Sequence, residues 1–102
     1  MIEHYVLIKA KPGREEDVSN ALRDFAHGVV EEAYVLELTF GRNLNSRSGD
    51  MGWTHGLLAR LASMDVLQND YWRHAAHTAL LEVLDATTEE RFALDYETPL
   101  PR

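Results

Sequence analysis

The segment Tyr-Trp-Arg-His-Ala-Ala-His, residues 71–77, contains side chains of types that can move protons. An unperturbed histidine has a pKa near ~6.5, so His77 can take up and return a proton near neutral pH. The hydroxyl of Tyr71 can donate a hydrogen bond to an oxygen atom that gains negative charge during a reaction. A base and an oxyanion donor together suit the removal of a proton from carbon between two carbonyl groups, which needs no cofactor.

The spacing of Tyr71 and His77 sets a condition on the chain between them. In one unbroken helix, six residues correspond to a turn of about 600°, a net ~240°, and the two side chains would face apart. They converge only if the helix is interrupted, and residues 71–74 are the expected break. The alternative is that Tyr71 anchors a turn between helices through its hydroxyl, while His77 serves packing or backbone hydrogen bonding.

Two further histidines, His4 and His55, each open an expected strand, where a polar side chain can lie at a cavity rim. Antiparallel neighbours begin at opposite ends, so the two rings are not expected to hold one ion together. His74 lies three residues before His77, but His-x-x-His is a weak metal signal, and we interpret His74 as a structural hydrogen-bonding residue. The chain has no cysteine, which excludes thiolate ligands and disulfides. The sequence therefore predicts no metal site.

Hydrophobic periodicity predicts the elements that must position these residues. Strands are expected at residues 2–9, 33–41, 54–61 and 91–97. Helices are expected at residues 14–27, from the N-cap Ser63 to near Asn69, and from the break to about Leu84. The order β-α-β-β-α-α-β, with right-handed crossovers, gives an antiparallel sheet in the order 4-1-3-2 with the helices on one face. This is the ferredoxin-like α+β fold.

The two central strands of that sheet are apolar on both faces. In the first strand, Val6 and Ile8 point one way and Leu7 points the other. In the third strand, Leu57 and Leu58 lie on opposite faces. A sheet with helices on one face and water on the other should alternate between apolar and polar side chains. We therefore expect a second copy of the chain to cover the open face.

Composition limits the classes of function. The 102 residues form a single domain, residues 1–102, and hydrophobic residues make up 45% of them. Ten Lys and Arg against 17 Asp and Glu give a net charge of −7, which argues against a nucleic-acid partner. No apolar run is long enough to cross a bilayer, and the first residues lack a secretory pattern, so a cytoplasmic protein without a membrane partner is expected. Dinucleotide and phosphate-loop glycine patterns are absent.

Several segments point to one known family. They are residues 4–13 (HYVLIKAKPG), the Thr-His-Gly-Leu-Leu start of the third strand, the His-x-Ala-His at residues 74–77 and the closing residues 95–99 (DYETP). In this order and spacing the chain resembles the stress-responsive dimeric α+β barrel (Dabb) family over nearly its whole length. The resemblance implies two ferredoxin-like subunits packed sheet to sheet, with a pocket between each sheet and its own helices.

The resemblance also implies roles for particular residues. A plant member of the family closes a linear poly-β-ketone by intramolecular aldol condensation, and its catalytic tyrosine and histidine match Tyr71 and His77. Its supporting pocket histidines match His4 and His55. One departure is Ala75, where the family usually has proline. We expect further substrate-binding residues on the sheet and before its third strand: Val6, Ile8, Leu57 and Trp53.

Two classes of function follow from this site. In the first, the protein is an enzyme without a cofactor, with His77 as general base, Tyr71 as oxyanion donor, and His4 and His55 positioning the substrate. In the second, the same pocket binds a small hydrophobic or aromatic ligand without catalysis, as a stress-associated module. Metal or haem chemistry has the least support.

Overall fold

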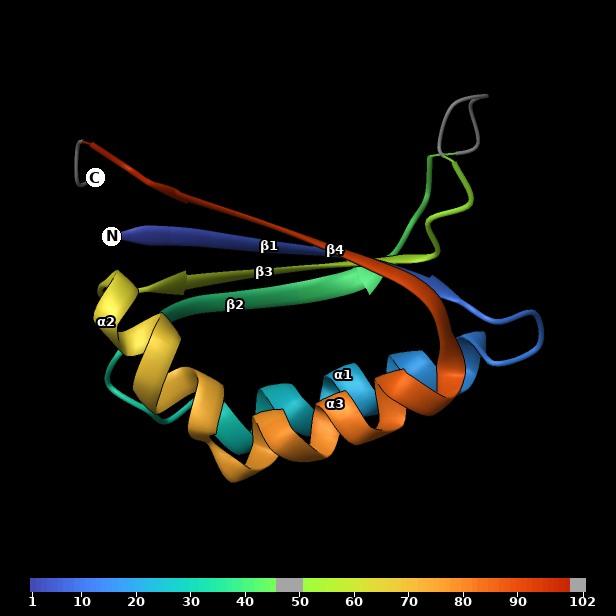
Figure 1. Ribbon diagram of the computed structural model, residues 1–102, viewed down its shortest axis with the longest axis horizontal. Coiled ribbons are helices and arrows are strands. Elements are labelled where there is room, and N and C mark those ends of the chain that lie inside the picture. The colour runs from blue at the N-terminus through green and yellow to red at the C-terminus, as the bar shows by residue number, and fades with distance from the viewer. Residues whose placement is uncertain (46–50, 100–102) are drawn as a thin grey trace.

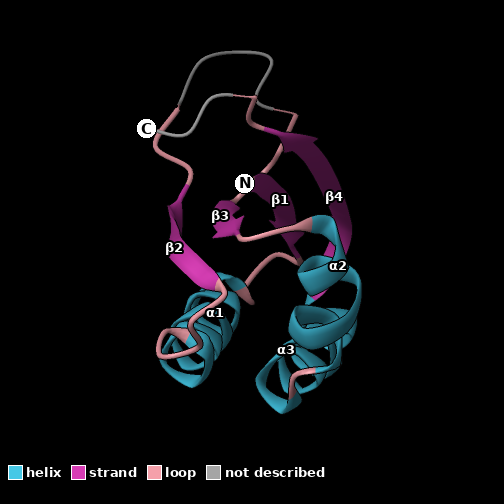
Figure 2. Cartoon of the chain, turned by 90° about the vertical axis from the view of Figure 1, so that its left-hand side faces the viewer, coloured by secondary structure: helices cyan, strands magenta, loops and turns pink. Residues whose placement is uncertain are grey.

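A computed structural model describes residues 1–45 and 51–99, which form one antiparallel sheet with helices on a single face (Figures 1 and 2). The elements along the chain are β1 (Ile2–Ala10), α1 (Glu15–Val29), β2 (Val35–Arg42), β3 (His55–Leu61), α2 (Met64–Val66), the π-helical turn η1 (Leu67–Tyr71), α3 (Ala75–Thr87) and β4 (Thr88–Glu97). The strand order is β2-β3-β1-β4, so the predicted ferredoxin-like α+β fold and sheet order are confirmed. No described helix is long and apolar enough to cross a bilayer.

Helix α3 ends later, and strand β4 begins earlier, than the sequence predicts. The helix continues to Thr87 and the strand begins at Thr88, whereas the expected boundaries were Leu84 and Arg91. The Thr87 and Thr88 hydroxyls donate to the carbonyls of residues 83 and 84 at 2.8 and 2.6 Å, which satisfies the end of the helix. A register shift in β1 between residues 9 and 10 then lets Thr88 pair with the sheet.

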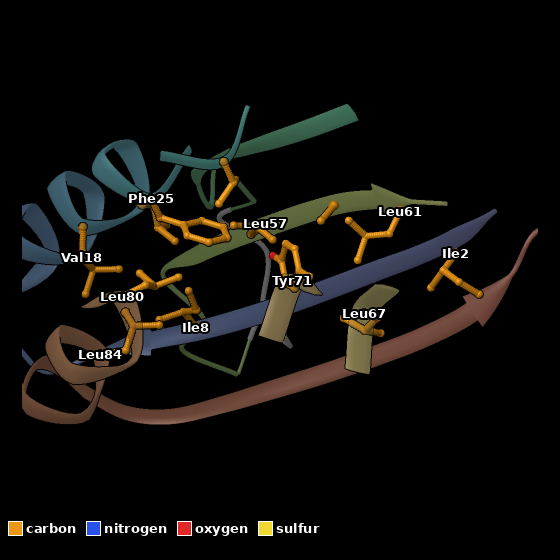
Figure 3. Packing of buried hydrophobic residues seen from close by; sticks show 14 of the residues in the cluster. Ile2, Ile8, Val18, Phe25, Leu57, Leu61, Leu67, Tyr71, Leu80 and Leu84 are labelled. Carbon is orange, nitrogen blue, oxygen red and sulfur yellow. The ribbon is translucent and has the colours of Figure 1, made fainter. Parts of the chain in front are cut away.

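The inner face of the sheet and α1 form the core. Helix α1 presents one apolar stripe at helical spacing to the sheet: Val18, Ala21, Leu22, Phe25 and Val29. On β3, every second residue from His55 to Leu61 is buried, as the strand period requires. Figure 3 shows Phe25, Leu57 and Tyr71 packed together between the helices and the strands. This packing holds α1 at a fixed rotation above β3.

Helices α1 and α3 lie side by side beneath the sheet (Figure 2). They pack closely where Gly28 of α1 meets Ala76 of α3. A Cβ atom at Gly28 would lie 2.7 Å from the Cβ of Ala76, closer than real Cβ contacts allow. Since Ala76 is in the first turn of α3, the absence of a side chain at Gly28 sets how near α3 begins to α1.

The outer face of the sheet is apolar at its centre and charged at one end. Leu7, Phe92 and Leu94 are exposed there. Among the described residues, no helix lies over this face of the sheet (Figure 2). At the end of this face, Arg60 donates to Glu3 at 2.9 Å and to Glu37 at 2.7 Å. An apolar surface of this kind favours a second copy of the chain.

Replacing Leu58, at the centre of the outer face, with lysine should therefore prevent self-association. The substitution would place an unpaired charge in the expected interface. Sedimentation velocity at micromolar concentration should show a dimer for the wild type and a monomer or aggregate for Leu58→Lys. Val30→Lys is the matched control, because Val30 is 60% exposed at the end of α1, away from the outer face. A monomeric wild type would contradict the expected dimer.

The contact at Gly28 generates a second prediction. Gly28→Ala should gain about 1 kcal/mol of helix propensity but cost ~1–3 kcal/mol through overpacking against Ala76. We expect net destabilisation, and Ala76→Gly in the same chain should relieve the overpacking. A double-mutant cycle from urea unfolding should give a favourable coupling energy of about 1 kcal/mol. Additive effects would show that the helices move apart without cost.

Candidate active site

The chain changes direction between Tyr71 and His77, as their spacing requires. The turn η1 ends at Tyr71, and His74 has extended backbone angles, φ −60° and ψ 137°, before α3 begins. The ring of His74 accepts a hydrogen bond from the Ala76 N–H at 3.0 Å and so caps α3. The ring centroids of Tyr71 and His77 lie 5.2 Å apart as a result. The predicted break and the structural role of His74 are both present in the structure.

A cavity of about 230 Å³ lies between α3 and the inner face of β1, β3 and β4. Its polar lining groups are His4, Tyr71, His77 and Arg91. The other lining side chains are apolar, and they include three residues that the sequence analysis assigned to the pocket: Val6, Ile8 and Leu57. A small apolar cavity with a few polar groups at defined places is the usual form of a small-molecule site.

His77 is held in the form that a general base needs. Its Nδ1–H donates to the carbonyl oxygen of Trp72 at 3.1 Å, which leaves Nε2 as the nitrogen without a proton. Burial lowers the pKa of His77 below its ordinary value and outweighs the opposing effect of that hydrogen bond. The neighbouring His4 and His74 lower this pKa further. His77 is therefore neutral at pH 7.

Tyr71 remains a hydrogen-bond donor at all physiological pH values. Its side chain is 1% exposed, and burial raises the pKa of the hydroxyl well above its ordinary value. Phe25 and His4 hold the ring on two sides, each in an edge-on contact with centroids 5.7 Å apart. Tyr71 lines the cavity, so its hydroxyl can donate a hydrogen bond to an oxygen atom of a molecule bound there.

A carboxylate that was not predicted from the sequence contacts His4 behind the cavity lining. Asp95 of β4 pairs with His4 of β1 in the sheet register, and its Oδ1 contacts His4 Nδ1. The contact orients the ring and leaves Nε2 of His4 as the other polar nitrogen. The sequence did contain a signal for Asp95. The alternation of Arg91, Ala93 and Asp95 along the last strand places polar side chains on the face that points toward the helices.

His55 and Trp53, by contrast, do not line the cavity with Tyr71 and His77. His55 is 2% exposed and lies between two hydroxyls, with Ser19 Oγ 2.9 Å from Nε2 and Thr54 Oγ1 2.8 Å from Nδ1. Thr54 Oγ1 also donates to the Ile8 carbonyl at 3.1 Å, so these bonds join α1 to β1 and β3. Since both ring nitrogens are occupied, the geometry supports a structural role for His55.

Trp53 lies before β3 beside a groove on the outer face of the sheet. The Lys9 ammonium is 5.3 Å from the centroid of its ring, a cation–π arrangement. The placement follows from Lys9, which faces outward because odd-numbered residues of β1 point away from the helices.

The described residues contain no group of three or more potential metal ligands. His74 Nε2 lies 3.3 Å from Glu32 Oε2, and its other nitrogen caps α3. His4 and His55 pair with Ala59 and Ile8, so they are four residues apart along the sheet, as the antiparallel arrangement predicts. That the protein works without a metal or cofactor stays a prediction.

Comparison with known families identifies the family to which this chain belongs. The family model of the stress responsive A/B barrel domain (Dabb) matches residues 2–98. The chain belongs to this family. The match covers all four strands and the helices that line the cavity, so every residue of the candidate site belongs to the Dabb domain.

Solved structures agree with the fold of this Dabb protein. A dimeric ferredoxin-like protein of unknown function from Bacteroides fragilis has 24% identity and a TM-score of 0.78, covering 95% of both chains. A dimeric ferredoxin-like protein from Jannaschia has 18% identity and a TM-score of 0.83, covering 95% of this chain and 98% of that one. An Arabidopsis thaliana protein has 17% identity and a TM-score of 0.80, covering 100% and 99%. At these identities the likeness shows the fold alone, and no curated protein matches the sequence.

Burial of His55 predicts how stability depends on pH. Burial lowers the pKa of His55, and Arg42 lowers it further, so the unfolded chain takes up a proton as the pH falls through ~6.5 while the folded chain does not. Stability should therefore fall from that pH down to the lowered pKa of the folded state. His55→Gln should cost about 1–3 kcal/mol at neutral pH but reduce this acid dependence.

The measurement is urea unfolding at about pH 7.5 and pH 5.5, which span the ordinary histidine pKa. His27→Gln is the control, because His27 is an exposed histidine in the last turn of α1. It should keep the wild-type difference between the two pH values. An unchanged difference in His55→Gln would contradict the proposed effect of burial.

Proposed function

We propose that this Dabb protein removes a proton from a carbon atom between two carbonyl groups and closes the resulting enolate onto a second carbonyl of the same molecule. The observation that carries the proposal is that one apolar cavity holds both the Tyr71 hydroxyl and His77, whose Nδ1–H is bound to the Trp72 carbonyl so that Nε2 is free to accept a proton. A base and an oxyanion donor at such a distance are the two groups that this reaction needs.

The proton and electron pair can be followed through the step. His77 Nε2 takes the proton from the acidic C–H, and the electron pair of that bond moves to the carbonyl, whose oxygen accepts a hydrogen bond from Tyr71. The enolate carbon then bonds to the second carbonyl carbon. The proton on His77 returns to the new alkoxide, so the base is regenerated and no oxidant or metal is consumed.

His4 and Asp95 support this chemistry as positioning residues. The carboxylate fixes the ring of His4 against Tyr71, and His4 lines the cavity beside it. We assign to His4 Nε2 a hydrogen bond with the substrate, which orients the carbonyl toward the Tyr71 hydroxyl. We do not assign this role to His55, because hydroxyls of Ser19 and Thr54 lie within hydrogen-bonding distance of its two ring nitrogens.

The plant family member that this chain resembles is olivetolic acid cyclase, and this resemblance supports the choice of reaction. Tyr71, His77 and His4 stand where that enzyme has its catalytic tyrosine, catalytic histidine and one pocket histidine. The two relatives described as dimeric support the proposal that the working form is a homodimer, with the apolar outer faces of two sheets in contact. Substrates of the poly-β-ketone class follow from the resemblance and from the apolar lining of the cavity.

His77→Ala should lower the rate of carbon deprotonation by about 10²–10⁴. The exchange of the methylene protons of acetylacetone for deuterium, followed by NMR, measures this step without requiring the natural substrate. Tyr71→Phe should lower the rate by about 10²–10³, since the enolate oxygen loses its donor. His27→Ala should leave the rate unchanged.

The pH dependence provides a second readout of the same proposal. The base is active when neutral, so the rate should rise with pH and level off above the lowered pKa of His77, below the ordinary ~6.5. Asp95→Asn should shift this profile and reduce the rate less than His77→Ala does. Acetylacetone that binds to the wild type without any enhanced exchange would favour the non-catalytic ligand-binding function and contradict the enzyme.

A further inference from the structure

The cavity has a second polar end, opposite the catalytic one, and its charged group is Arg91. In the sheet register Arg91 pairs with Ile8, while Asp95 pairs with His4. Both therefore lie on the inner face of β4, four residues apart, a distance of about 13 Å along a strand. Arg91 lines the cavity at the end where α3 contributes Leu84. Among the described lining residues it is the one that carries a permanent positive charge.

Arg91 has hydrogen-bonding capacity left for a ligand. A guanidinium has five N–H donors, and Arg91 uses Nη2 to donate a hydrogen bond to Asp85 Oδ1 at 2.7 Å. The side chain of Asp85 is 67% exposed and that of Arg91 is 32% exposed, so this ion pair lies at the mouth of the cavity. Exposed pairs of this kind hold their partners weakly, and a ligand carboxylate can share or replace Asp85.

The surface between the two polar ends is suited to a short carbon chain. His77 and Leu84 both line the cavity and are seven residues apart on α3, which corresponds to about 10 Å. The lining between them is apolar and includes Leu80 and Leu81. The volume of about 230 Å³ is below the usual range for drug-sized ligands. The cavity thus fits a narrow molecule with one polar group at each end.

We infer that the ligand is a short oxo acid whose ionised carboxylate is held by Arg91, with its reactive carbonyl groups at Tyr71 and His77. This rests on the proposed function for the reactive end and adds the anionic end. The planar guanidinium matches a carboxylate in a two-pronged geometry, which makes Arg91 a residue that determines specificity. Anchoring the carboxylate sets the distance of the acidic carbon from His77.

The experiment compares octanoate with octanamide, which have the same chain length and differ in charge. Calorimetric titration of the wild type should show octanoate binding about tenfold more tightly, the effect of a charge-assisted hydrogen bond. Arg91→Gln should remove this preference and leave the affinity for octanamide unchanged. Asp85→Asn should increase the affinity for octanoate several-fold, because the competing carboxylate is gone. Arg23→Gln is the matched control, since this exposed arginine on α1 lies outside the cavity.

The outcomes separate this inference from the proposed function. If Arg91→Gln keeps the wild-type preference for octanoate, the anionic end is refuted, while deuterium exchange that depends on His77 would still support the carbon-acid reaction. If Arg91→Gln loses the preference but no variant or wild type enhances exchange, the carboxylate site stands and the catalytic proposal fails. Equal binding of both probes to the wild type would also overturn the inference.

Discussion

The break in the helical segment at His74, which also caps α3, is the constraint on which the site depends. Its extended backbone interrupts what would otherwise be one helix, and its own ring closes the first turn of α3. Without that interruption Tyr71 and His77 would point to different sides of the helix. The break also brings the Trp72 carbonyl oxygen to His77 Nδ1, which selects the tautomer whose Nε2 can accept a proton. One backbone feature therefore sets the distance between Tyr71 and His77, the direction of their side chains and the tautomer of His77.

Strand order and the break before α3 could be predicted from the sequence. The strand order follows from the order of the elements and right-handed crossovers, and the break follows from the six-residue spacing of Tyr71 and His77. The pairing of His4 with Asp95 could not, because it depends on the register of strands 91 residues apart. The hydrogen bonds of His55 could not be predicted either. The sequence around His55 does not show that Ser19 of α1 lies against its ring, because this depends on how α1 packs on the sheet.

The sheet serves two different surroundings with one set of strands. Its inner face carries the cavity, and the helices close that side. Its outer face places Leu7 and Leu58 where only another apolar surface removes them from water. Trp53 belongs to this outer side, so this aromatic residue, predicted from the sequence to bind substrate, lies near the expected subunit contact. A change at the outer face therefore acts on the cavity only through the strands that both share.

The π-helical turn that ends at Tyr71 makes the direction of this side chain sensitive to the length of the segment before it. The hydrogen bonds of a π-helical turn join residues i and i+5, so the turn holds about one residue more than an α-helical turn. Losing that residue would restore a regular helix and rotate Tyr71 by about 100° relative to what precedes it. A deletion of one residue here would therefore turn the Tyr71 hydroxyl away from the cavity while leaving every strand intact.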